Sequence, residues 1–182
     1  MKKLNKNNKG FSLVELLVVI AIMVVLVGVV APSLLSNIEK TRESKDIQAL
    51  DTLAGNVQAA MTDEDIYDAI IAAAGTEDDF VFDLVKAYDE TKAVLGSSAT
   101  KANKKFATAL DGYLNNANVY DASGIKVFGS KSAKDGKAIL VDINVKTGSI
   151  TVALVKTATA TAIADSDVVT GAKSGNAYSV TR

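Results

Sequence analysis

The chain has 182 residues, enough for one ordinary domain with an appendage, and 48% of them are apolar. It contains no Cys and no His, which excludes disulfides, thiolate or imidazole metal sites, and nucleophiles activated by His. Its 20 basic and 21 acidic side chains give a net charge of −1, and this balance argues against a specific nucleic-acid partner, because phosphate neutralisation needs clustered Lys and Arg.

The first 31 residues have the pattern of a membrane segment. Residues 1–10 contain four Lys and no acid, and residues 11–31 are strongly polar only at Ser12 and Glu15. As a helix, 11–31 is about 32 Å long, roughly one hydrocarbon core. The lysines favour a cytoplasmic N-terminus, and the apolar run is longer than that of a secretory signal. We therefore expect a single-pass segment in the cytoplasmic membrane.

Glu15 is the unusual residue of this segment. An ionisable side chain at the centre of a bilayer costs about 2.5–3.5 kcal/mol, and less near the interface. Either Glu15 reaches the headgroups or stays protonated, or it meets a partner with positive charge.

The sequence around Glu15 resembles the N-terminus of type IV pilins and the related pseudopilins. Residues 9–17 read Lys-Gly-Phe-Ser-Leu-Val-Glu-Leu-Leu, and an apolar run continues to Pro32. The resemblance covers residues 1 to about 60. It implies that a prepilin peptidase cuts after Gly10 and that the new amine of Phe11 is N-methylated. That amine is then the positive partner of Glu15, from a neighbouring subunit of a filament.

Gly28 and Pro32 form a second irregularity in the apolar run. Pro32 cannot donate a hydrogen bond to the Gly28 carbonyl, and Gly is itself a poor helix former. The pair is either a tolerated kink or, as the resemblance implies, a hinge that loosens on assembly. Val24 stands where many pilins carry a Gly.

After Pro32 the pattern becomes amphipathic. A very polar stretch, residues 39–46, precedes apolar residues with the spacing of one helical face: Ile47, Leu50, Leu53, Ala54, Val57 and Met61. We expect a stalk helix over 11–61, in which 11–31 is the transmembrane segment and filament core and 32–61 docks on a globular head, 62–182.

The first half of the expected head, residues 62–117, has the pattern of short helices. Thr62 with Asp65 and Thr76 with Asp79 resemble capping pairs, and the spacing of the acids does not match a calcium loop. Residues 61–90 carry a net charge of −9 and residues 91–137 one of +5. These charges either cover solvated helical faces or meet each other, within the chain or between neighbouring copies.

The second half, residues 124–182, alternates between apolar and polar residues. We expect an antiparallel sheet whose clearest part is a hairpin, with strands over 139–145 and 150–154 and a turn at 146–149. Further strands are expected near 125–128 and 178–181. Helices followed by an antiparallel sheet predict an α+β head, which without Cys is held by strand pairing and packing.

The expected function is that of a structural subunit, with no catalytic residues, no cofactor and no metal. By resemblance it is a type IV pilin that polymerises with copies of itself into a surface filament for adhesion and twitching motility. The implied partners are the prepilin peptidase and N-methylase, an assembly ATPase, a membrane platform protein, and membrane lipid before assembly. The alternatives are a secretion-system pseudopilin, a competence pilin or, in a different class, a single-pass membrane-anchored binding domain or enzyme.

Overall fold

A computed structural model describes residues 11–74, 78–84, 120–121, 124–125, 128–157 and 163–182. Contacts within the chain define two compact units, an N-terminal unit, Met1–Ile38, and a C-terminal unit, Glu39–Arg182. The expected leader, 1–10, and the expected helices over 85–117 lie outside the described residues.

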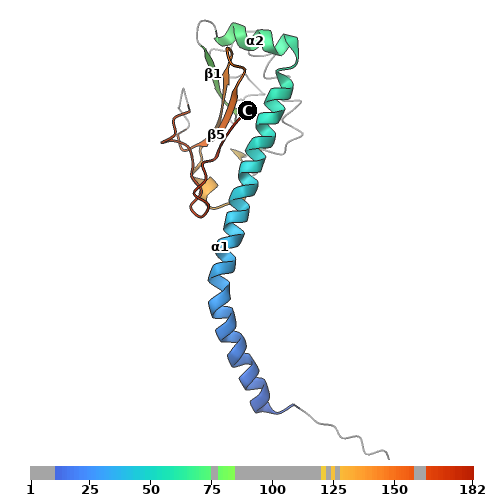
Figure 1. Ribbon diagram of the computed structural model, residues 1–182, viewed down its shortest axis with the longest axis vertical. Helices are drawn as coiled ribbons and strands as arrows, with labels where there is room; N and C mark the ends of the chain where they lie inside the picture. The colour runs from blue at the N-terminus through green and yellow to red at the C-terminus, as the bar shows by residue number, and fades with distance from the viewer. Residues whose placement is uncertain (1–10, 75–77, 85–119, 122–123, 126–127, 158–162) are drawn as a thin grey trace, which may run out of the picture. The chain divides into compact units, whose positions relative to one another are not determined.

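The longest element, helix α1, is Leu13–Ala60 (Figure 1). Its bounds lie within two residues of the stalk helix that the sequence predicts. The Val- and Leu-rich first half and the Ala-, Gln- and Leu-containing second half are both compatible with helix. The boundary between the two units falls inside this helix, between Ile38 and Glu39.

Helix α2, Glu64–Ala74, follows α1 after a short turn. The Asp65 backbone N–H donates to Asp63 Oδ1 at 3.0 Å, so Asp63 is the residue that caps α2. The expected cap, Thr62, instead donates its hydroxyl to the Ala59 carbonyl at 2.7 Å, at the end of α1. The cap therefore lies one residue later than the sequence pattern predicts.

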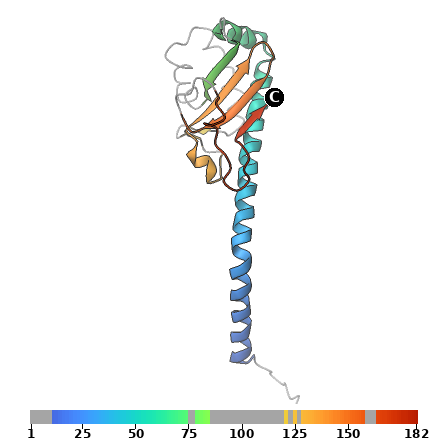
Figure 2. The same ribbon diagram turned by 60° about the vertical axis from the view of Figure 1, so that its left-hand side comes forward.

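Four strands form an antiparallel sheet in the order β1-β4-β5-β6, and Figure 2 shows them side by side. They are β1, Asp79–Asp83; β4, Ala138–Asn144; β5, Ile150–Val155; and β6, Ser179–Thr181. The predicted hairpin is confirmed, with Ile143 opposite Ile150 and Gly148 in the turn at φ 72°. The expected strand at the C-terminal end is also present.

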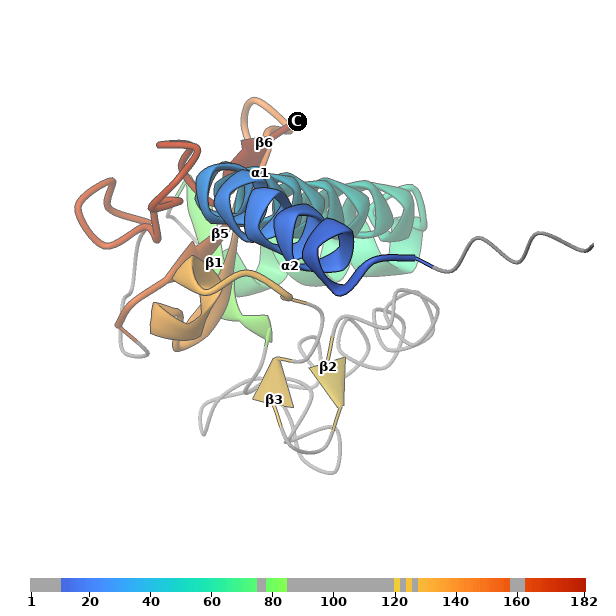
Figure 3. The same ribbon diagram turned by 90° about the horizontal axis from the view of Figure 1, so that it is seen from below.

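Three shorter elements of the described residues, two strands and a 3₁₀ helix, precede β4. Strands β2, Tyr120–Asp121, and β3, Gly124–Ile125, pair with each other, and Figure 3 shows them beside one another. The 3₁₀ helix η1, Ser132–Asp135, lies between β3 and β4 in the chain.

The expectation of helices alone over 62–117 is wrong at β1. The sequence spacing of Phe80 and Leu84 fits a helical face, but residues 79–83 pair with β4, and Phe80 lies opposite Ile143. The physical reason is the run Phe80-Val81-Phe82, because aromatic and β-branched residues suit a pleated, half-buried surface.

The main core of the C-terminal unit lies between α1 and the inner face of the sheet. Leu50, Leu53 and Val57 of α1 are fully buried in one cluster with Val141 of β4 and Val152 of β5. This half of α1 therefore shares one core with the sheet. A smaller cluster covers the other face of the sheet and contains Leu140, Ala153, Val155 and Val168. The layout is α+β, as the sequence predicts.

Most of the described acids of the predicted acidic segment are on the surface, and Asp83 is half-buried. Asp63, Glu64, Asp65 and Asp68, around the start of α2, are all exposed. Much of the basic half, residues 91–119, lies outside the described residues.

Candidate assembly site and a buried carboxylate row

The N-terminal end of α1 is closed by two of its own side chains. The Ser12 backbone N–H donates to Glu15 Oε2 at 2.8 Å, and the Val14 N–H donates to Ser12 Oγ at 3.3 Å. This is close to a capping box, with Ser12 as the N-cap and Glu15 as the third helical residue, except that the Ser12 hydroxyl accepts from the second helical residue and not from the third. The carboxylate also lies at the positive end of the helix dipole.

Of the predicted site residues, the structure brings Glu15 together with Ser12. Phe11 is 93% exposed and directly precedes the capping residue, and Glu15 is exposed as well. Gly10 lies outside the described residues. Ser12 is a residue whose role the sequence analysis missed, although Ser-x-x-Glu before an apolar run is a readable capping signature.

The side chains that follow Glu15 form an apolar surface on all sides of the helix. Every large apolar side chain from Leu13 to Val30 is between 47% and 79% exposed. A helix that is apolar on all sides belongs in a membrane or inside a larger assembly. By length and composition, α1 is able to cross a membrane, and the apolar helix fits a membrane-anchored protein.

Gly28 and Pro32 both lie inside α1, which continues through them. A Cβ added at Gly28 meets nothing within 4 Å, so neighbouring side chains of the described residues do not require glycine there. The hinge therefore stays a prediction.

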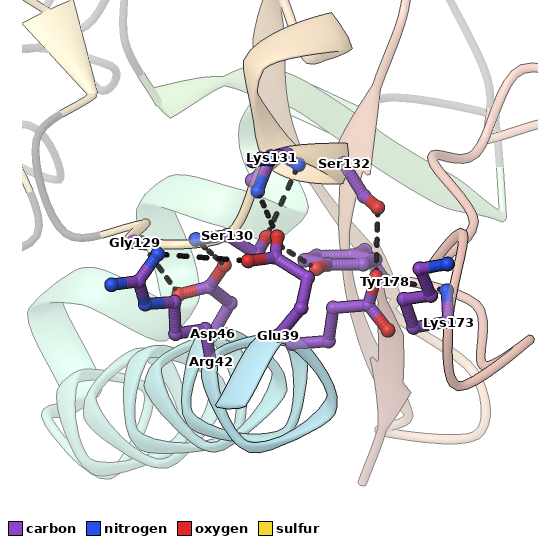
Figure 4. Close-up of polar contacts among 11 residues, drawn as sticks. Glu39, Arg42, Asp46, Gly129, Ser130, Lys131, Ser132, Lys173 and Tyr178 are labelled. Carbon is purple, nitrogen blue, oxygen red and sulfur yellow. Dashed lines mark hydrogen bonds and ion pairs between the residues drawn. The ribbon is translucent and has the colours of Figure 1, made fainter. Parts of the chain in front are cut away.

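A second polar site lies at the start of the C-terminal unit. Glu39, Glu43 and Asp46 are spaced to lie on one face of α1 and are 8%, 0% and 2% exposed; we call them the carboxylate row. Figure 4 labels Glu39 and Asp46 of this row. Sequence analysis missed their burial and treats residues 39–46 as a polar stretch only. The readable signal is their spacing of four and three residues, which puts acids on one helical face.

Two loops of the C-terminal unit donate hydrogen bonds to the row. Asp46 accepts from the Gly129 N–H at 2.8 Å and from the Ser130 N–H at 3.0 Å. Glu39 accepts from the Lys131 N–H, and the Arg42 guanidinium lies 3.6 Å from its other oxygen. The row therefore holds the loop that leads into η1.

Glu43, the central member, holds both loops. It accepts from Ser132 Oγ at 2.8 Å and from the backbone N–H groups of Lys173 and Ser174 at 3.1 and 2.7 Å. Burial alone would raise the pKa of Glu43, but the hydrogen bonds from Ser174, Ser132 and Lys173 outweigh burial and leave that pKa below 4.5.

Comparison with known proteins gives a match at the N-terminal end of the chain. Residues 5–31 match the model of the prokaryotic N-terminal methylation motif, a range that includes Gly10, Phe11 and Glu15. No curated protein and no solved structure matches the chain significantly. The motif is the prepilin leader signature of type IV pilins and pseudopilins, and it points to a structural protein. Together with the apolar helix and the α+β layout, it supports a type IV pilin-like or pseudopilin protein.

Proposed function

We propose that the chain is the structural subunit of a type IV pilus, a surface filament used for adhesion and motility. The observation that carries the proposal is the apolar surface from Leu13 to Val30, exposed on all sides in one copy of the chain. Such a surface requires lipid before assembly and the same surface of neighbouring copies afterwards. Because lipid tails are as apolar as these side chains, transfer into a filament gains packing energy, and charge matching must fix the geometry.

In this proposal a prepilin peptidase cuts after Gly10, and methylation follows on Phe11. Before assembly the chain resides in the cytoplasmic membrane with a cytoplasmic N-terminus. An ATPase and a platform protein transfer it to the filament, because such a helix does not leave lipid spontaneously. The new amine of Phe11 then meets Glu15 of a neighbouring copy. A buried carboxylate without a partner is costly, so this pairing fixes the axial register of the subunits.

The capping box allows a test that separates charge from local structure. Glu15→Gln keeps a side chain able to reach back to the Ser12 N–H but removes the negative charge. Ser12→Ala removes the capping hydroxyl and keeps the charge. We predict that Glu15→Gln lowers filament yield at least about tenfold, the effect of roughly 1.4 kcal/mol, whereas Ser12→Ala assembles at close to wild-type yield.

The measurements are electron microscopy of surface filaments and mass spectrometry of the N-terminus. We expect cleaved, methylated Phe11 in the wild type and in both variants. Equal filament yields from Glu15→Gln and the wild type would show that assembly does not need the negative charge of Glu15. An unprocessed, monomeric protein resident in lipid would instead favour a membrane-anchored binding domain or enzyme. Adhesion and motility are compared in cells with and without this one gene.

A further inference from the structure

The carboxylate row is surrounded by hydrogen-bond donors from parts of the chain that are far away in sequence. Carboxylates are rarely this deeply buried unless they are paired. Here the partners of Glu43 and Asp46 are mainly backbone N–H groups of two loops, 129–132 and 171–174. Ser132 links the two loops, because its hydroxyl donates to Glu43 and accepts from the Ala172 N–H at 2.9 Å.

The 171–174 loop fits closely around Glu43. A Cβ added to Gly171 would lie 2.8 Å from Glu43 Oε2 and 2.4 Å from Ser174 Oγ. Both oxygens of Glu43 already accept hydrogen bonds, Oε1 from Ser132 and Lys173 and Oε2 from Ser174. A proton on either oxygen would compete with these donors and weaken the acceptor, so the site fits the carboxylate and not the acid.

The charged groups around Glu43 come from every element packed against it. Glu39 and Asp46 lie one turn away on α1, and Arg42 contacts Glu39. Lys131 and Lys173 are exposed, and the hydrogen bonds that they make to the row come from their backbone N–H groups. In Figure 4 the phenol of Tyr178 lies among these carboxylates.

We propose that the carboxylate row attaches the 171–174 loop to α1 in a pH-dependent way. Ionised Glu43 holds the loop on the helix, and protonation of Glu43 releases the loop while the sheet stays folded. The chain has no Cys, so no disulfide holds this loop. The inference concerns a single copy of the chain and does not depend on filament formation.

The direction of the pH dependence follows from linkage. The pKa of Glu43 is lower in the folded protein than its ordinary value of 4.5. Its contribution to stability is therefore fully present above about pH 4.5 and is lost as the pH falls through the folded value. Hydrogen bonds to a charged group are strong enough for opening to change protection about 10- to 100-fold.

Amide hydrogen exchange of the full chain in detergent micelles tests the proposal, with rates corrected for the intrinsic effect of pH. On acidification we expect peptides over 171–175 to lose about 10- to 100-fold protection, while peptides over β4 and β5 keep theirs. Glu43→Gln is expected to show the same loss at neutral pH. The amide NH₂ of Gln would face hydrogen-bond donors of the loop where Glu43 presents an acceptor oxygen. The matched control is Asp51→Asn on the same helix, whose carboxylate is partly exposed and pairs with Arg182 at 2.8 Å; it should leave 171–175 protected.

Two results would overturn the proposal. One is a Glu43→Gln protein in which 171–175 stays protected at neutral pH. The other is a wild-type protein in which this loop and the β4–β5 hairpin lose protection at the same pH, which would mean global unfolding. If Glu43→Gln does not fold, the pH series on the wild type decides between local and global opening without it.

Discussion

Tyr178 is a fully buried phenol whose hydroxyl lies 2.6 Å from Ser130 Oγ. Burial and the negative charges of Asp46, Glu43 and Glu39 raise the pKa of Tyr178 to about 12, although the hydrogen bond with Ser130 opposes the shift. The folded pKa is above the ordinary value of 10.0. The stability that this phenol contributes is therefore full below about pH 10 and is lost as the pH rises through the folded value.

We predict that Tyr178 titrates at about pH 12, above the ordinary value of 10.0, and that the loss of stability in base begins above pH 10. Ultraviolet absorbance of the phenolate measures the first quantity, and thermal melting as a function of pH measures the second. Tyr178→Phe should remove the late step and flatten the loss of stability. Tyr67→Phe is the control, because Tyr67 is exposed. Identical alkaline profiles of Tyr178→Phe and the wild type would contradict the prediction.

Single residues differ in how far sequence predicts their roles. Glu15 is recognisable because a lone acid in an apolar run is a local feature. The burial of Glu43 is not, because its partner Ser174 lies 131 residues away in sequence, and an acid in a polar stretch is ordinarily solvated. Only the tertiary fold places these donors against the helix.

The β4–β5 hairpin is the element whose turn depends most clearly on one glycine. Gly148 has φ 72°, a conformation that costs a residue with a Cβ about 1–2 kcal/mol. Gly129, by contrast, has no positive φ, and a Cβ added there meets nothing within 4 Å.

We predict that Gly148→Ala lowers the free energy of unfolding by about 1 kcal/mol and Tm by about 2–4 °C. Gly129→Ala should melt at or slightly above the wild-type temperature, because alanine restricts the unfolded chain without straining the folded one. Thermal melting followed by circular dichroism compares the two. Equal destabilisation by both substitutions would show that the positive φ of Gly148 is not the cause.

Among the helices and strands, the sequence predicts those with a continuous hydropathy pattern and misses those whose conformation depends on a partner distant in sequence. The hairpin is predicted because Ile139, Val141 and Ile143 alternate with their neighbours, and the strands are close in sequence. Strand β1 is five residues long and pairs with β4, with Asp79 opposite Asn144. Its short aromatic run fits a helical face as well, so only the pairing decides its conformation.

Helix α1 belongs to two compact units that differ in where their apolar side chains lie: buried in the C-terminal unit and exposed in the N-terminal unit. Among the described residues, both core clusters are built from residues of the C-terminal unit, and the N-terminal unit presents its apolar side chains outward. The sequence predicts this contrast from hydropathy alone. It does not predict the position of the boundary, because the carboxylate row extends the C-terminal unit to Glu39 through contacts with distant loops.

This division predicts the behaviour of two truncated chains. A chain beginning at Ser36 keeps the carboxylate row and the core and loses the exposed apolar side chains before it, so we expect a folded, monomeric protein without detergent. A chain beginning at Ile47 keeps the core cluster but lacks Glu39, Glu43 and Asp46, the acceptors of both loops. Its free energy of unfolding should be lower by about 1.5–3 kcal/mol, the range for hydrogen bonds to charged groups. Light scattering and thermal melting measure both chains. Equal melting temperatures would show that the row adds no stability, and aggregation of the longer chain would show that the C-terminal unit does not fold by itself.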